Sequence, residues 1–273
     1  MINGVALLRD VVYIICPGVS SILRFSVVTN QPLTDIKVKD LRAPCDIAVC
    51  EQTSQLYVAE REREADRECV WRVSADGADV KRWLPRSPSD KFTLWSLSVT
   101  STRLLVTSRI TNQLEQFDSL GNQLRRVQLP DDMQPHHAVE SPTGTFIVSH
   151  YNSQLVQYQL SEVDTEGEVL RQFSSSSRQP PLGWTPHIAI DSRSNIIAAD
   201  FDRCCVLLLD ARLKLRRVIV DELELNYKRP RCLSYREQSG HLLVGCVNRK
   251  DRVAVIDRKD RIAMIAVFDV LRH

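Results

Sequence analysis

The chain repeats one pattern six times, at intervals of about 45 residues. Each repeat begins with a short apolar run whose third residue is small. This small residue is Ala6, Ala48, Ser98, Ala138, Ala189 and Ser234 in turn. A second apolar run follows a few residues later, at 56–59, 104–107, 146–149, 196–199 and 242–245. One such unit cannot bury its apolar face alone, so neighbouring units must pack against each other.

The rest of each repeat alternates apolar and polar residues over short stretches, which is the pattern of β-strands rather than of helices. The third segments are 69–73, 113–117, 154–158, 206–209 and 252–256. The fourth, more polar segments are 80–84, 123–129, 169–173, 215–220 and 262–267. Four antiparallel strands in each of six repeats predict an all-β fold, a six-bladed β-propeller of four-stranded antiparallel blades.

We therefore expect one domain over residues 1–273, with blades at about 1–43, 44–91, 92–133, 134–183, 184–228 and 229–273. The fourth strands are the outer edges, where Arg125, Arg126 and Arg171 discourage edge-to-edge association. The chain begins at an inner strand and ends at an outer one, so no terminal strand completes the blade of the other end. Closure of the ring then depends on packing between blades, unless the chain is one module of a longer protein.

Composition excludes several classes of function. Lys and Arg total 36 against 34 Asp and Glu, and this net charge of +2 gives no general preference for polyanions. The longest apolar runs are far shorter than a membrane span, and the first residues do not resemble a secretory leader. Most of the eight cysteines lie in or beside apolar strands, and no Asn-X-Ser/Thr site occurs. We expect a reduced, cytoplasmic protein with no membrane partner.

Two repeats carry a more specific motif. Pro44-Cys-Asp-Ile-Ala-Val precedes Leu56-Tyr-Val-Ala-Glu, and Thr185-Pro-His-Ile-Ala-Ile precedes Ala198-Ala-Asp-Phe-Asp-Arg. These segments resemble NHL repeats, such as those of the NHL domain of tripartite-motif proteins, and the resemblance covers five good units and a degenerate first one. It implies a propeller that binds protein or RNA, although related propellers include metal-dependent lyases and lactonases, so the fold does not decide the function. No RING or B-box array of Cys and His is present, so the resemblance does not carry ligase activity.

Residues at the start of the inner strands are expected to face the central channel, and these are Asp46, Ser96, His136, His187 and Cys232. Because Asp and His are ordinary zinc ligands, Asp46, His136 and His187 form a candidate metal site. The alternative is that they satisfy strand-end amides and channel waters. Calcium requires more acids than Asp46 alone. We predict no cofactor, with zinc or calcium in the channel as the alternative. Glu60 and Asp200 are expected to brace loops by accepting backbone hydrogen bonds.

The loops between second and third strands, and the linkers between blades, open on one face of a propeller, here called the loop face. We predict that Trp95, Trp184 and Tyr151 bind a partner there, helped by Arg109 and Arg203. The same face carries a basic group, Arg229, Arg231, Arg249 and Lys250, with Tyr151, Phe201 and Tyr227 available to stack on bases. The sequence thus favours a non-enzymatic scaffold for a protein or peptide. Single-stranded RNA binding is the alternative, and a channel-metal lyase or hydrolase comes third.

Overall fold

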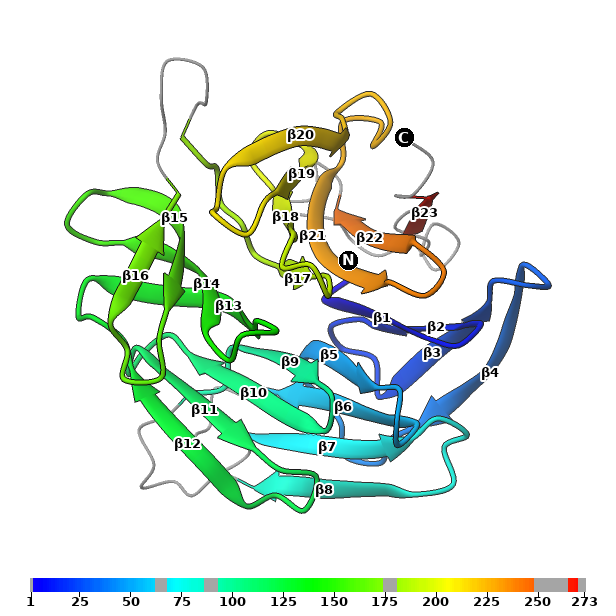
Figure 1. Cartoon of the computed structure of the whole chain (residues 1–273). Helices are drawn as coiled ribbons and strands as arrows, with labels where there is room; N and C mark the ends of the chain where they lie inside the picture. Colours follow the sequence, from blue (N-terminus) through cyan, green and yellow to red (C-terminus); the bar gives the residue numbers. More distant parts are fainter. Residues whose placement is uncertain (1, 62–67, 86–92, 174–180, 248–264, 270–273) are drawn as a thin grey trace.

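The computed structural model describes residues 2–61, 68–85, 93–173, 181–247 and 265–269, and the regular elements in these ranges are β-strands (Figure 1). Six antiparallel sheets follow one another along the chain and surround a central channel, with the first strand of each sheet innermost (Figure 1). The fold is therefore a β-propeller, as the repeats predict. No helix in the described ranges is long and apolar enough to cross a membrane.

The strands of each sheet are consecutive in the chain. The first sheet contains β1 (Gly4–Leu8), β2 (Val11–Ile15), β3 (Ser21–Ser26) and β4 (Gln31–Lys37). The second contains β5 (Pro44–Cys50), β6 (Gln55–Glu60), β7 (Cys69–Ser74) and β8 (Val80–Pro85). The third contains β9 (Ser96–Thr100), β10 (Arg103–Ser108), β11 (Gln113–Phe117) and β12 (Gln123–Gln128).

The remaining sheets repeat this order. The fourth contains β13 (Met133–Glu140), β14 (Phe146–Asn152), β15 (Gln157–Val163) and β16 (Val169–Gln172). The fifth contains β17 (Ile188–Ile190), β18 (Ile196–Asp200), β19 (Cys205–Leu209) and β20 (Leu215–Val220). The sixth contains β21 (Arg229–Arg236), β22 (His241–Val247) and β23 (Ile265–Asp269).

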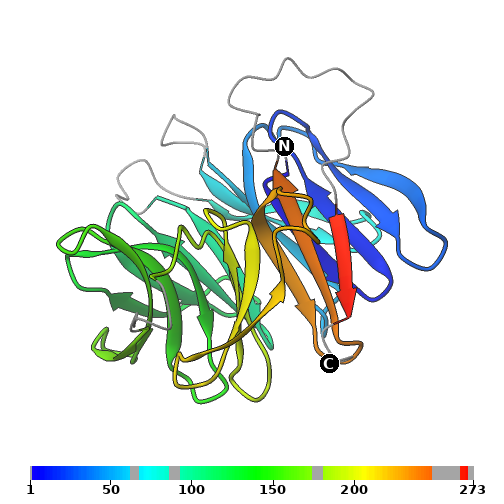
Figure 2. The same cartoon turned by 90° about the horizontal axis from the view of Figure 1, so that it is seen from above.

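The sixth sheet differs from the prediction of four strands in every blade. The sequence pattern assigns 262–267 to an outer fourth strand, whereas Ile265–Asp269 pairs directly with β22, placing Val267 opposite Leu243 (Figure 2, β23 in red). The predicted third strand, 252–256, lies outside the described residues. Both segments are mostly apolar and of strand length, so their composition could not decide which one pairs with β22. Five blades have four strands, and the sixth sheet has three in the described chain.

The third strand of the fourth sheet also starts later than predicted, at Gln157 rather than Gln154. Asn152 Oδ1 accepts hydrogen bonds from the backbone N–H groups of Gln154, at 3.1 Å, and Leu155, at 2.8 Å. This side-chain bonding makes a turn of residues whose alternation resembles a strand. As a result Leu155 and Val156 are exposed on the loop face, by 59% and 72%.

The core consists of six buried apolar clusters, one between each pair of neighbouring sheets. The cluster between the first and sixth sheets includes Ile2, Leu7, Cys232 and Leu243. The backbone N–H of Leu7 also donates to Ser234 Oγ at 3.0 Å. The ring is thus closed by packing of β1 against β21 and β22, without a strand shared between the two ends. This arrangement leaves the starts of the inner strands around one mouth of the channel.

Candidate functional site

Six equivalent residues begin the inner strands at the loop-face end of the channel. Their equivalence follows from strand pairing, because each lies opposite the corresponding residue of its second strand, as Asp46 lies opposite Ala59. His187 is placed by its carbonyl, which accepts the N–H of Ala199 at 3.1 Å. The six positions are Gly4, Asp46, Ser96, His137, His187 and Cys232.

The prediction that His136 belongs to this set is wrong, because His137 occupies the position. A β-bulge between Pro135 and His137 adds one residue, His136, to the strand. The error comes from aligning the repeats on Ala138. The residue equivalent to Ala48, which lies opposite Tyr57, is Val139, which lies opposite Ile147. The spacing from proline indicates His137, because Asp46 also follows its proline by two residues across the same irregularity.

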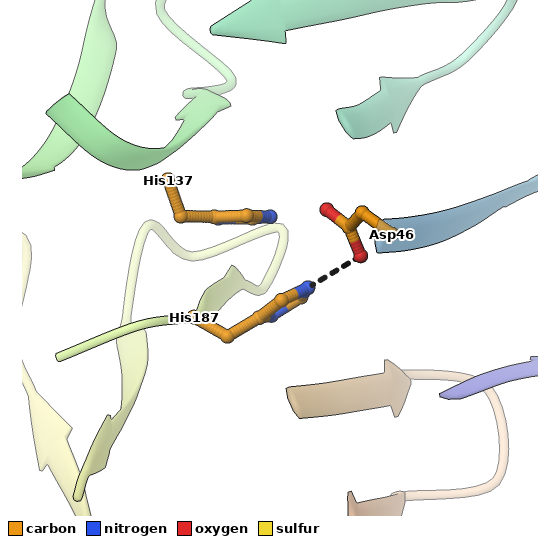
Figure 3. A group of neighbouring side chains, drawn as sticks. All are labelled: Asp46, His137 and His187. Carbon is orange, nitrogen blue, oxygen red and sulfur yellow. Dashed lines mark ion pairs between the residues drawn. The ribbon is translucent and has the colours of Figure 1, made fainter. Parts of the chain in front are cut away.

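Asp46, His137 and His187 converge on one another in the channel (Figure 3). His187 Nε2 lies 3.8 Å from Asp46 Oδ1, and one donor atom from each of the three residues lies within 4.8 Å of the others. Asp46 and His137 are 3% and 1% exposed. The three residues come from the second, fourth and fifth repeats, so only the closed ring brings them together.

The backbone of Leu97 connects two of these residues. Its N–H donates to Asp46 Oδ2 at 2.8 Å, and its carbonyl lies 3.1 Å from His137 Nε2. His137 Nδ1 accepts the N–H of Ile188 at 3.4 Å. The carbonyl requires a proton on Nε2 and the amide requires a bare Nδ1, so both contacts fit the same neutral tautomer of His137.

Burial controls the protonation of these residues, because it disfavours their charged forms. Desolvation lowers the pKa of His137 to about 4 and raises the pKa of Asp46 to about 7. The pKa of His187 lies well below its usual value, because of burial and the neighbouring His137. Near neutral pH the channel therefore holds two neutral imidazoles and a partly protonated carboxyl group.

These donor types suit zinc, but most of the donor atoms are already engaged. Asp46 uses one oxygen for Leu97 and the other for the N–H of Ile47, at 2.8 Å. Both ring nitrogens of His137 also have partners. His187 is less engaged, because its Nδ1 has no hydrogen-bond partner in the described chain and its Nε2 lies 3.8 Å from Asp46 Oδ1. A metal ion can bind this set only by breaking backbone hydrogen bonds, so the metal site stays a prediction, with His137 in place of His136.

An aromatic group lies above this set, at the channel mouth. His136, displaced by the bulge, has its ring centroid 6.1 Å from that of Trp95, 6.0 Å from Trp184 and 5.9 Å from Tyr158. Trp184 in turn contacts Phe201 at 4.6 Å. We call these five residues, Trp95, His136, Tyr158, Trp184 and Phe201, the mouth cluster. Neither Tyr158 nor the role of His136 was predicted, because their contacts depend on the bulge and on packing between blades.

Arginines cover the mouth cluster. The guanidinium carbons of Arg61 and Arg109 lie 4.1 Å and 5.2 Å from the centroid of the Trp95 ring. Arg229 lies 4.9 Å from the centroid of Phe201. Guanidinium groups stacked on aromatic faces lose less freedom when they bind a further ligand, because their planes are already fixed.

Two carboxylates position the linker that carries Trp184. Asp200 Oδ2 accepts the N–H of Gly183 at 3.1 Å, and Asp202 Oδ2 accepts that of Trp184 at 2.8 Å. A Cβ atom at residue 183 would collide with the Asp200 carboxylate, so glycine is required there. The predicted loop-bracing role of Asp200 is confirmed. Glu60 does the same in the second sheet, accepting the N–H of Arg42 at 2.6 Å.

A cavity of about 60 Å³ opens between the mouth cluster and the channel. Trp95, His136 and Trp184 line it together with Arg61, Arg231 and Asp46. Both ring nitrogens of His136 and Trp184 Nε1 are buried with no hydrogen-bond partner in the described chain. Unsatisfied buried polar atoms are uncommon in folded proteins and indicate a missing partner or a functional role.

The other predicted loop-face residues lie around this cavity. Tyr151 contacts Tyr158, with ring centroids 5.3 Å apart. Arg203 donates to the carbonyl of Pro181 and lies 3.7 Å from Asp200, so it holds the linker. Arg229 and Arg231 are half-buried at the start of β21, whereas Arg249 and Lys250 lie outside the described residues.

The opposite mouth is wider and acidic. Its cavity of about 550 Å³ is lined by residues of all six sheets, among them Glu51, Glu140 and Glu237. These acids have partners: Arg236 lies 3.3 Å from Glu51, Arg103 lies 3.1 Å from Glu140, and the Ser192 N–H donates to Glu237. The two mouths therefore differ in charge, with arginines and aromatic rings at one end and carboxylates at the other.

The architecture is that of known β-propeller proteins. A chain of hydrazine synthase from Kuenenia stuttgartiensis matches with a TM-score of 0.64 at 12% identity, over 98% of this chain and 95% of that chain. Virginiamycin B lyase from Staphylococcus aureus matches with a TM-score of 0.62 at 9% identity, over 99% and 84%. A chain of a nidogen/laminin complex matches with a TM-score of 0.62 at 15% identity, over 82% and 81%.

The sequence matches no protein-family profile and no curated protein. At identities this low, the structural matches establish the β-propeller fold and nothing about activity. The specific resemblance to the NHL domain of tripartite-motif proteins is not confirmed by them.

Proposed function

We propose that this β-propeller is a non-enzymatic binding module that holds a protein or peptide segment on its loop face. The mouth cluster and its stacked arginines carry the proposal, because they gather at one channel mouth from the second to the sixth sheet. Trp, Tyr and Arg are the residues that most often dominate the energy of protein interfaces. Trp95, Trp184, Tyr151 and Arg109 are proposed to contact the partner, with Arg203 supporting the linker.

Exposed apolar side chains on the same face support this proposal. Ile110, which follows β10, is 72% exposed. Leu155 and Val156, in the turn before β15, are 59% and 72% exposed. Exposed apolar side chains on the same face as the mouth cluster provide area that a partner can bury.

The proposal also covers the number of blades, the family relationship and the cellular location of the protein. We assign the whole chain, 1–273, to one six-bladed domain in which the three-stranded sheet is the sixth blade, and we keep the NHL-repeat resemblance as its family relationship. None of the eight cysteines is in a disulfide bond, and six of them are buried. Cysteines without disulfide bonds support a reducing, cytoplasmic location.

Single-stranded RNA is the second candidate, and the stacking of Arg229 on Phe201 favours it. The chain's net charge of +2 gives no general attraction for polyanions, so the peptide partner ranks first. The third candidate, a channel-metal lyase or hydrolase, requires the engaged donors of Asp46 and His137 to be released.

Selection from a random peptide library tests the proposal. Selected peptides should bind the wild-type protein and lose about tenfold or more in affinity to an Ile110→Asp/Leu155→Asp variant. Leu120→Asp is the matched control, because Leu120 is 79% exposed in the turn between β11 and β12, away from the loop face. Thermal unfolding should be unchanged in both variants.

Two results would reject the peptide function. Selected peptides whose affinity is equal for wild type and the double variant do not use the loop face. A single-stranded RNA pool that binds with a steep salt dependence, lost in Arg229→Glu/Arg231→Glu, would replace the peptide proposal with RNA binding.

A further inference from the structure

The cavity below the mouth cluster has hydrogen-bond donors that nothing in the described chain satisfies. His136 is 4% exposed, and neither of its ring nitrogens has a partner. Trp184 Nε1 is buried and unpartnered in the same cavity wall. An indole N–H can only donate, and a neutral imidazole has one N–H, so the wall presents donors to any bound group.

Positive charge is added to this wall by Arg61 and Arg231. Neither guanidinium has a carboxylate within ion-pair distance in the part of the chain that the structure describes. Stacking on Trp95 fixes the plane of Arg61. The acid in the wall, Asp46, has both oxygens turned to the backbone N–H groups of Ile47 and Leu97, which offset its negative charge.

From these contacts we propose that the cavity binds a carboxylate group of the peptide held on the loop face. The inference rests on the proposed function, since it names the chemical group that the same site recognises. A carboxylate only accepts hydrogen bonds and pairs in a planar, bidentate way with a guanidinium, so it complements both the orphan donors and the arginines. The group comes either from an Asp or Glu side chain or from the C-terminus of the peptide.

The size and shape of the cavity favour carboxylate over phosphate. Its volume of about 60 Å³ leaves room for only a few water-sized groups. The aromatic walls are flat, and a planar carboxylate lies against them better than a tetrahedral phosphate does. The Trp184 nitrogen is shielded from solvent in the free protein, so binding includes a rotation of this half-buried indole, a common adjustment at interfaces.

Nuclear magnetic resonance of the indole N–H groups provides the test. The chain has four tryptophans, and Trp184→Phe identifies the Trp184 signal. The probes are N-acetylglutamate amide for a side-chain carboxylate and N-acetylglycylglycine for a terminal one. The neutral counterparts are N-acetylglutamine amide and N-acetylglycylglycine amide, and inorganic phosphate is the third anion.

At least one carboxylate probe should shift the Trp184 signal saturably, about tenfold more tightly than its amide counterpart. The Trp71 signal is the internal control, because its Nε1 already donates to Glu60 Oε2 at 2.7 Å. Whichever carboxylate binds more tightly identifies the source of the group. No Trp184 shift up to about 50 mM, an equal shift with the amide, or tighter binding of phosphate would overturn the inference.

Variants separate this inference from a general loss of folding. His136→Phe keeps an aromatic ring beside Trp95 but removes both nitrogens, and Arg231→Gln removes one charge. Each should weaken carboxylate binding about fivefold or more, whereas Arg216→Gln on the outer strand β20 should not. Equal binding by His136→Phe, Arg231→Gln and wild type would reject the site.

The two proposals fail in distinguishable ways. In one case, selected peptides depend on the loop face and yet bind equally well with or without a carboxylate group. That result would preserve the peptide function and reject the carboxylate site. The opposite result is a Trp184 signal that shifts with carboxylate probes while no selected peptide depends on the loop face. It would show an anion pocket and reject the peptide function on which this inference rests.

Discussion

The imidazole rings of His137 and His187 face each other in the channel, with centroids 3.8 Å apart and planes inclined by 31°. Two imidazolium ions at this separation would repel each other in a site that is also shielded from water. Folding therefore holds both rings neutral. The same condition applies to His136 and His150, whose pKa values burial lowers to about 3 and about 4.

These four histidines predict a loss of stability in mild acid. Their folded pKa values lie below the unfolded value of about 6.5, so the unfolded chain takes up protons first as the pH falls. Asp46 acts in the opposite direction, because its folded pKa of about 7 lies above its unfolded value. Burial also raises the pKa values of Glu140 and Asp200, which oppose the loss in the same way as Asp46. We therefore expect the free energy of unfolding to fall by up to about 3 kcal/mol from pH 6.5 to 5.5, measured by urea denaturation.

Asp46→Asn checks the sign of the Asp46 contribution. This variant removes the opposing group, so its stability should fall more steeply with decreasing pH than that of the wild-type protein, by about 1 kcal/mol over the same interval. A free energy of unfolding that stays constant between pH 6.5 and 5.5 would contradict the assignment of neutral, buried histidines.

Zinc addition tests the candidate metal set. Binding through His137 has to break one of its hydrogen bonds, either to the carbonyl of Leu97 or from the N–H of Ile188, so we expect no tight complex. Protein incubated with one equivalent of zinc and then desalted should retain about a tenth of an equivalent or less by elemental analysis. Full retention that disappears in His187→Gln would instead establish a channel metal site and revive the lyase or hydrolase candidate.

The repeat pattern predicts the propeller and most inner and outer strands, because alternating burial is a local property of the chain. It fails where pairing depends on residues far apart in sequence. In β13 the residue equivalent to Ala48 is Val139 rather than Ala138, so the predicted channel side chain is wrong by one position, and only the pairing with β14 shows this. The mouth cluster likewise depends on packing between neighbouring blades, which brings the rings of Trp95 and Trp184 to 6.1 Å and 6.0 Å from that of His136.

Glu60 is expected to be more important for stability than its place at a strand end suggests. This carboxylate is 2% exposed and accepts hydrogen bonds from the N–H of Arg42, the N–H of Ala43 and Nε1 of Trp71. Glu60→Gln presents an amide NH₂ to one of these donors and should cost about 2–3 kcal/mol in urea denaturation. Asp79→Asn, at a half-exposed carboxylate, is the control and should cost about 0.5 kcal/mol or less. Equal effects of the two substitutions would show that Glu60 does not brace the linker.

Closure of the ring by packing makes a quantitative prediction about Leu243. This side chain is fully buried in the cluster between the first and sixth sheets, as Leu114 is between the third and fourth. Truncation to alanine leaves a cavity at either site, so Leu243→Ala and Leu114→Ala should each lower the free energy of unfolding by about 2–5 kcal/mol. If Leu243→Ala costs less than about 1 kcal/mol while Leu114→Ala has its full effect, the two ends of the ring do not pack together in solution. The channel residues would then lack the closed wall that brings Asp46, His137 and His187 together.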